Sequence, residues 1–302
     1  MAKSLFFSGD FEQAIVNLDK AVALYEPDLQ RRYITRRTHD SGIDAIVYRM
    51  WTLFPLGYPE AAEKSREQMI TGAREIGHVY TLMVALHGAA WHHLIWTRNS
   101  VAADAATDEI FMLVEKHDAP FWEASALQQR GFSLIIAGKH NEAIGYLSSG
   151  LATYRSTGAT LGMPTLKAHF ALAHAGLGEL EVARQYIEEA LATVATTKER
   201  YFEAGVLQIA SQIALLQRCP DSKLAELYLT RGLEFCRERS IKGTELRLSL
   251  DLARLWRENG KTREAYGLLA PVYNWFTEGF DWIDMKQAKA LLEELRVELR
   301  IS

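Results

Sequence analysis

The sequence predicts an all-α protein in which antiparallel helix pairs of about 40 residues stack in a row and form an α-solenoid. Three observations support this prediction. A glycine followed five residues later by an alanine recurs along the chain. Alternating runs of Val, Ile and Thr bounded by hairpin turns, which are typical of strands, are missing from the sequence. The length of 302 residues, of which 48% are hydrophobic, suits either two ordinary domains or one elongated array.

The recurring glycine marks the turn inside each predicted unit. Glycine can end a helix in the left-handed conformation without a Cβ penalty, and the alanine five residues later lies in the next helix. A large apolar residue follows four of these alanines at the helical spacing of four positions, which indicates a buried stripe. The pairs are Gly9/Ala14, Gly57/Ala62, Gly138/Ala143, Gly178/Ala183 and Gly260/Ala265. Degenerate copies near Asn99 and Pro220 complete a step of about 40 residues.

The apolar periodicity predicts the helices in chain order. Their expected positions are 10–25, 42–56, 59–76, 79–97, 100–117, 120–137, 140–156, 164–177, 180–195, 200–217, 221–239, 243–258, 261–275 and 284–298. Since the repeat recurs from Gly9 to Gly260, we interpret residues 1–302 as a single array.

Three segments depart from the regular unit. Residues 1–25 are interpreted as a truncated first unit, because Ala2 falls at the small-residue position of a first helix. Since end units normally present a polar outer face, we expect an upstream domain, a covering partner, or self-association through residues 1–25. Residues 26–41 form a predicted basic loop that is long for a link between helices. Residues 277–302 are interpreted as a C-terminal cap.

The spacing of small and apolar residues resembles the tetratricopeptide repeat. In one unit, Gly131 is followed by Gly138, Ala143, Leu147 and Gly150, so that small residues stand where two helices approach closely. The family's unit has about 34 residues, whereas the unit here has about 40, so the array is expected to be a divergent, tetratricopeptide-like one. The resemblance implies a concave groove, made mainly by the first helix of each pair, that binds a protein or peptide partner.

The C-terminal part resembles a narrower group of proteins. Residues 245–260, 275–280 and 288–295 are similar to the closing stretch of bacterial multidomain regulators. In these, a class III adenylate or guanylate cyclase domain, or another output domain, precedes a STAND-type ATPase and a long tetratricopeptide-like region. The resemblance implies a sensory or interaction part for signal transduction without its catalytic neighbours, because no phosphate-binding Gly-x-x-x-x-Gly-Lys-Ser/Thr motif occurs.

Composition and motifs exclude several functional classes. The formal net charge of −4 argues against a nucleic-acid partner, whose phosphates attract basic surfaces. Neither a signal peptide nor an apolar run of membrane-spanning length is present, so we expect a cytoplasmic chain without a membrane partner. Cys219 and Cys236 are too few for a disulfide framework, and the spacing of His87, His92 and His93 does not suit a metal. We expect no catalytic residues, no metal and no cofactor, and hence no enzyme.

Two sets of residues are candidates for partner binding. Gln128, His169, Gln208 and Arg247 lie on first helices and are expected to face the groove. The basic loop offers Arg31, Arg32, Arg36 and Arg37, whose guanidinium groups could bind an acidic peptide or a phosphate. The alternative for these arginines is solvated charge that pairs with neighbouring acidic helices.

The leading hypothesis is therefore a non-catalytic protein-interaction and sensory scaffold. The alternative is a helical domain that senses a small molecule in a pocket near Trp91, Trp96 and Trp122 and regulates a linked or partner cyclase, ATPase or transcription factor.

Overall fold

The computed structural model describes residues 1–26, 38–217 and 219–300, and these form helices joined by turns, with no strand among them. In chain order the helices are α1 (Ala2–Phe7), α2 (Phe11–Ala23), α4 (Ser41–Leu56), α5 (Pro59–Ile76), α6 (Val79–His92), the π-helical turn η2 (His93–Thr97), α7 (Ser100–Val114), α8 (Pro120–Ile136), α9 (His140–Ser156), α10 (Met163–Gly176), α11 (Leu180–Thr197), α12 (Glu203–Leu215), α13 (Ser222–Glu238), α14 (Lys242–Glu258), α15 (Thr262–Tyr273) and α16 (Ile283–Leu299). The all-α prediction is confirmed. Within the described ranges, no helix combines the length and apolarity that a membrane span requires.

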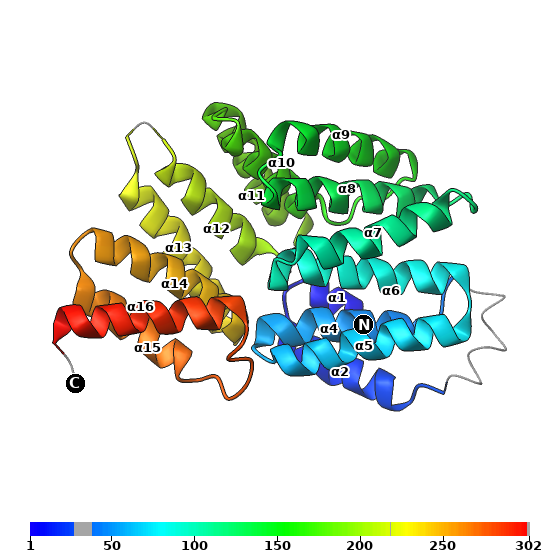
Figure 1. The fold of residues 1–302 in the computed structure, drawn as a ribbon, viewed down its shortest axis with the longest axis horizontal. Coiled ribbons are helices and arrows are strands. Elements are labelled where there is room, and N and C mark those ends of the chain that lie inside the picture. The colour runs from blue at the N-terminus through cyan, green and yellow to red at the C-terminus, as the bar shows by residue number, and fades with distance from the viewer. Residues whose placement is uncertain (27–37, 218, 301–302) are drawn as a thin grey trace.

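Neighbouring helices in the chain pack as antiparallel pairs. The most extensive contacts join α8 to α9, α10 to α11, α12 to α13, α4 to α5, and α14 to α15. Figure 1 shows these pairs stacked side by side in a curved row. The predicted row of helical hairpins is therefore present.

The repeated glycine and alanine have the conformations that the sequence predicts. Gly9, Gly57, Gly138, Gly178 and Gly260 all have positive φ, between 74° and 100°. The alanines five residues later, Ala14, Ala62, Ala143, Ala183 and Ala265, are fully buried. Only glycine adopts this backbone conformation at little cost, and only a small side chain lets the paired helices approach so closely.

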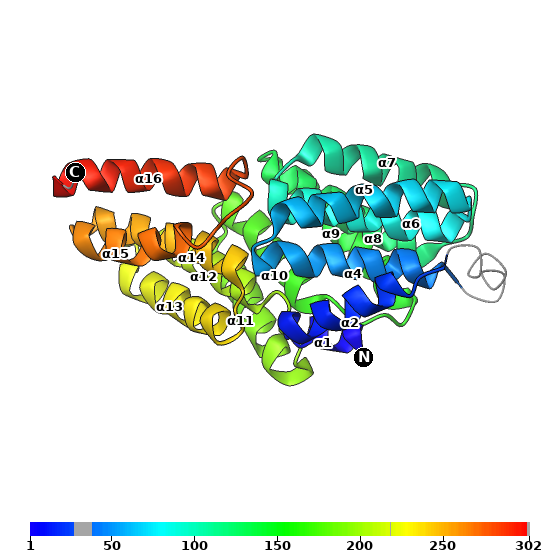
Figure 2. The same ribbon diagram turned by 90° about the horizontal axis from the view of Figure 1, so that it is seen from below.

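The N-terminal segment is folded into the body of the same chain. Phe6 and Phe11 are buried, and the carbonyl oxygen of Phe7 accepts hydrogen bonds from the backbone N–H groups of Arg200 (2.7 Å) and Tyr201 (3.2 Å). Figure 2 shows α1 and α2 lying beside α4. The aromatic side chains of this short first helix are thus covered from within, which differs from the exposed apolar end that the sequence suggests.

The array curls until its C-terminal helices contact its N-terminal ones. α14 packs on α4, and Gly243 lies so close to the Phe54 carbonyl oxygen that a Cβ on it would stand 2.4 Å away. Near the start of α5 the Glu60 N–H donates to Glu278, and the Gly279 N–H donates to Glu60, both at 3.0 Å. The row of pairs therefore curls back on itself, so that α14 contacts α4.

Candidate functional site

A cavity of about 1080 Å³ lies on the concave side of the array. Its walls come from α1, α4, α6, η2, α8 and α10, together with residues 157–162 and 201–202. Ligand-binding cavities typically measure about 300 to 1,000 Å³ and occur between packed helices. The size and position of this hollow make it the candidate site.

Tryptophans dominate one wall of the cavity. Trp91, Trp96 and Trp122, which the sequence placed near a small-molecule pocket, all line it, and so does Trp51. The Trp51 Nε1–H donates to the Gly88 carbonyl oxygen at 3.1 Å, which fixes this indole. The wall can therefore offer flat apolar surface to a ligand.

The end of the cavity near α1 is closed by aromatic rings and one ion pair. The Phe6 ring lies 5.3 Å from that of Tyr48 and 5.4 Å from that of Tyr201. Lys3 pairs with Asp44, and His39 Nε2 lies 3.6 Å from the same carboxylate. Burial acts to raise the pKa of Asp44, but the bonds from His39 and Lys3 outweigh it and hold that pKa below its ordinary value.

A polar group is embedded among the tryptophans. His87 Nδ1 lies 2.6 Å from Ser125 Oγ and 3.0 Å from Gln129 Nε2. The His87 ring makes edge-on contacts with Trp51 and Trp122, each at 5.6 Å between ring centroids. Burial lowers the pKa of His87 to about 4, so this imidazole is neutral at pH 7.

Two of the residues expected in the groove line the cavity. His169 is fully buried, with its ring stacked on Phe132 at 3.9 Å and on Trp91 at 5.6 Å between centroids. Burial lowers the pKa of His169 to about 3, and neither ring nitrogen has a partner within the described residues. Gln128 also lines the cavity, and its Nε2 is buried without a partner in the same part of the chain.

The other two do not line the cavity, which corrects the sequence-based expectation. The Gln208 amide donates to Asp251 at 2.6 Å, and Arg247 is buried in an ion pair with Asp284. Both side chains are used to join helices of the array, because each faces a neighbouring helix that carries a carboxylate. Arg31, Arg32, Arg36 and Arg37 lie outside the described residues.

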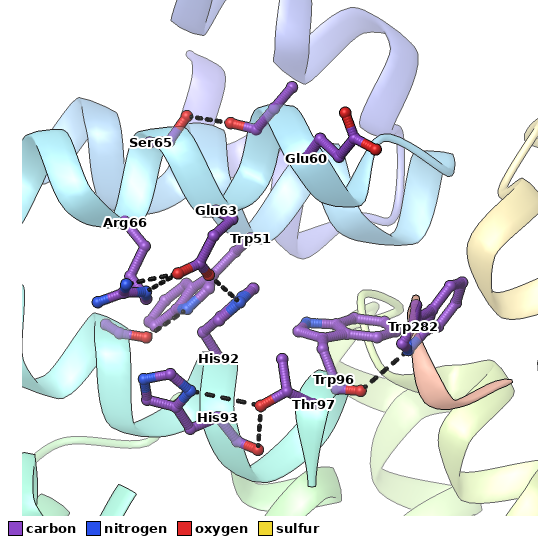
Figure 3. A network of polar contacts seen from close by, with 12 residues as sticks. Trp51, Glu60, Glu63, Ser65, Arg66, His92, His93, Trp96, Thr97 and Trp282 are labelled. Atoms are coloured by element: carbon purple, nitrogen blue, oxygen red, sulfur yellow. Dashed lines mark hydrogen bonds and ion pairs between the residues drawn. The ribbon is translucent and has the colours of Figure 1, made fainter. Parts of the chain in front are cut away.

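The wall of the cavity that carries Trp96 includes a π-helical turn, where the sequence predicts a continuous helix over 79–97. In Figure 3, His93 Nδ1 lies 3.3 Å from Thr97 Oγ1, and the Trp282 Nε1–H donates to the Trp96 carbonyl oxygen at 3.2 Å. Next to this turn, His92 and Arg66 hold the pKa of Glu63 at about 2. Side chains of α5 and of the C-terminal segment thus fix the wall that carries Trp96.

Sequence reasoning missed three of these groups. From the sequence, His87 is considered only as a metal ligand, a role that its spacing argues against, and Tyr48 and Trp51 are not singled out. The available signal was their spacing: Tyr48 and Trp51 are three residues apart on one helix, and His87 and Trp91 are four apart on another, so each pair shares a helix face.

The chain is similar to solved structures of helical regulators. A Rap protein complexed with the Competence and Sporulation Factor has a TM-score of 0.65 at 13% identity, over 98% of this chain and 79% of that one. The apo form of the quorum sensor NprR from B. thuringiensis has a TM-score of 0.52 at 10% identity, over 86% and 72%. NprR in complex with its cognate peptide NprX has a TM-score of 0.53 at 11% identity, over 86% and 73%.

No protein-family model matches the sequence, and no curated protein matches it either. The structural likeness at this low identity concerns the fold. The chain therefore has the stacked helical-repeat fold that is also found in Rap and NprR.

Proposed function

We propose that this chain is a non-catalytic sensory and interaction scaffold whose concave cavity binds a short peptide. The observation that carries the proposal is the cavity itself, which is closed on several sides, lined with aromatic rings and large enough for a few side chains. NprR, which has a similar fold, binds its cognate peptide NprX. Of the partner-binding residues expected from the sequence, Gln128 and His169 are kept as contacts because they line this cavity.

A second candidate function is the sensing of a small molecule. It is favoured by Trp91, Trp96 and Trp122, which come from three different elements and line one cavity. Such a site would bury most of a compact ligand.

Several finer points stay predictions. The link to a cyclase or a STAND-type ATPase and the bacterial source rest on the sequence resemblance alone, and the cytoplasmic location rests on the sequence lacking a signal peptide and a membrane-spanning apolar run. Self-association through residues 1–25 would have to use the exposed Val16 and Leu24, because Phe6, Phe11 and Leu18 are buried within the chain. The basic loop is retained as a possible second contact for an acidic partner.

A displayed library of random octapeptides tests the peptide proposal. Gln128→Trp places a large ring in the cavity, whereas Gln212→Trp makes the same change at an exposed site on α12 outside it. We expect one peptide family to be enriched on the wild type and on Gln212→Trp but not on Gln128→Trp. Enrichment on all three proteins, or on none, would contradict the proposal.

A thermal-shift screen of metabolites tests the second candidate. A ligand of the cavity should raise the melting temperature of the wild type in a concentration-dependent way and leave that of Gln128→Trp unchanged. The absence of any such metabolite would argue against small-molecule sensing.

A further inference from the structure

The charges that line the cavity cancel one another. In the described part of the wall, the side chains other than histidine and tyrosine that can carry charge are Lys3 and Asp44, and these two pair with each other. A ligand carboxylate or ammonium group that entered the tryptophan-lined region would therefore lose water without gaining an opposite charge. Such uncompensated burial is strongly unfavourable.

Four ionisable rings of the described wall are uncharged at neutral pH. Burial lowers the pKa of both His87 and His169 far below 7, so that each imidazole is uncharged there. Burial also raises the pKa of Tyr48 and of Tyr201, so both phenols remain protonated. Within the described residues, these four rings therefore add no charge to the tryptophan-lined region.

The hydrogen bonds around His87 determine which ring nitrogen carries the proton. Gln129 Nε2 lies 3.1 Å from the His87 carbonyl oxygen, which only accepts, so the nitrogen of that amide must stand there. The same Nε2 lies 3.0 Å from His87 Nδ1, and an amide nitrogen only donates. The Gln129 contact therefore favours Nδ1 as the acceptor and places the proton of the neutral ring on Nε2.

The Nε2–H group of His87 is the donor that lies among the indoles, in addition to the Gln128 amide and the His169 ring elsewhere on the wall. Among the described residues the hydrogen bonds of the His87 ring involve Nδ1, which has two partners, and none involves Nε2. The ring is surrounded by three indoles: Trp51 and Trp122 lie at 5.6 Å and Trp91 at 6.4 Å between ring centroids. A flat ligand among these rings could stack on them and accept this hydrogen bond.

We infer that the cavity recognises an uncharged, planar aromatic group that carries a hydrogen-bond acceptor, and that the acceptor binds His87 Nε2–H between Trp51, Trp91 and Trp122. This inference deepens the proposed function, since it names the chemistry of the effector that the cavity takes. An aromatic side chain of a peptide with its adjacent amide, and a free aromatic amide, both present this chemistry.

Three indoles of nearly the same shape test the charge selectivity. Indole-3-acetamide is neutral, indole-3-acetate is an anion and tryptamine is a cation at pH 7. In calorimetric titrations of the full chain, we expect the amide to bind at least about tenfold more tightly than either charged compound, which corresponds to about 1.4 kcal/mol. Equal or tighter binding of a charged compound, or no binding of the amide, would overturn the inference.

Substitutions test the role of His87. His87→Phe keeps a ring but removes the donor, and His117→Phe is the matched change at an exposed site away from this cavity. We expect indole-3-acetamide to bind about tenfold more weakly to His87→Phe and normally to His117→Phe. Unchanged binding to a folded His87→Phe would contradict the assignment. Independently of this variant, the ¹⁵N shifts of the wild-type His87 ring must show the Nε2-protonated tautomer.

Blocked peptides separate the two sources of the aromatic group. If acetyl-Gly-Trp-Gly-amide binds more tightly than indole-3-acetamide and its Gly-Ala-Gly analogue does not bind, the effector is a peptide. If indole-3-acetamide binds more tightly than acetyl-Gly-Trp-Gly-amide, the effector is a small molecule. Octapeptides that are enriched through a charged consensus, with no binding of indole-3-acetamide, would overturn this inference but leave the proposed function intact. Binding of the amide without any enriched peptide would reject the peptide proposal and support this inference.

Discussion

The buried guanidinium of Arg247 on α14 pairs with Asp284 on α16 and also reaches the end of η2, which lies in the N-terminal half of the chain. Its Nε donates to Asp284 Oδ2 at 2.8 Å, and its NH1 donates to the Ile95 carbonyl oxygen at 2.9 Å. The last carbonyl groups of a helix have no partner inside it, so a side chain distant in sequence completes the end of η2 here. Because Ile95 and Trp96 also line the cavity, this ion pair supports the wall of the candidate site.

Arg247→Ala should therefore destabilise the protein. Both partners are buried, and removal of the guanidinium leaves the Asp284 carboxylate with the partly exposed Arg98, 3.6 Å away, so we expect a cost of about 3 kcal/mol. Urea unfolding followed by circular dichroism measures this change. In the double variant Arg247→Ala/Asp284→Asn, the loss of unfolding free energy should be clearly smaller than the sum of the losses in the two single variants. A loss equal to that sum would show that the two side chains are not coupled.

Gly243→Ala should weaken the contact that closes the array. The added Cβ would stand 2.4 Å from the Phe54 carbonyl oxygen, and a backbone atom cannot move aside as a flexible side chain can. We expect a loss of about 1 to 3 kcal/mol in unfolding free energy. Gly267→Ala is the control: its Cβ meets nothing within 4 Å, so it should stabilise α15 by about 0.5 to 1 kcal/mol. A harmless Gly243→Ala would contradict the close packing of α14 on α4.

Phe6→Ala should open the end of the cavity near α1. The Phe6 ring is 4% exposed and packs on Tyr48 and Tyr201, so its removal should cost about 3 to 5 kcal/mol. It should also increase the quenching of tryptophan fluorescence by acrylamide. Leu24→Ala, at a residue that is 81% exposed, should change neither property. Unaltered quenching in Phe6→Ala would show that α1 does not close the cavity.

The stability of the protein should fall as the pH decreases below about 6.5. Burial lowers the pKa of folded His169 to about 3, whereas the unfolded chain takes up this proton near pH 6.5. Between these values the unfolded state binds more protons, so His169 contributes a loss of up to about 1.4 kcal/mol per pH unit. Urea unfolding at several pH values should show a shallower dependence for His169→Phe. A slope as steep as that of the wild type would indicate that His169 is protonated in the folded state.

The turns could be predicted from the sequence because they depend on local chemistry. Gly138 and the equivalent glycines of the other units adopt a left-handed backbone, and Ala143 and the equivalent alanines are buried where only a small side chain fits. The two residue types recur at a fixed spacing. Helix pairing follows from the short links between these helices. The fold class could therefore be predicted from the sequence.

The cavity and its residues depend on contacts that the repeat pattern does not contain. Whether Arg247 faces a groove or its neighbours depends on Asp284, which α16 brings against α14, and on the Ile95 carbonyl oxygen, which reaches it because the array curls back on itself. The π-helical turn at His93–Thr97 also shifts the faces of the residues that follow, which a regular period of 3.6 cannot anticipate. Likewise, His87 Nε2 is available as a donor because Ser125 and Gln129, which lie on another helix, contact Nδ1 of the same ring.

A crystal structure of the chain with the most strongly enriched octapeptide, or with indole-3-acetamide, tests the account most directly. We predict an aromatic ring between Trp91 and Trp122 with an acceptor atom within hydrogen-bond distance of His87 Nε2. A ligand bound on the convex face, with the cavity unchanged, would contradict the claim that this protein senses its effector through the concave side of the array.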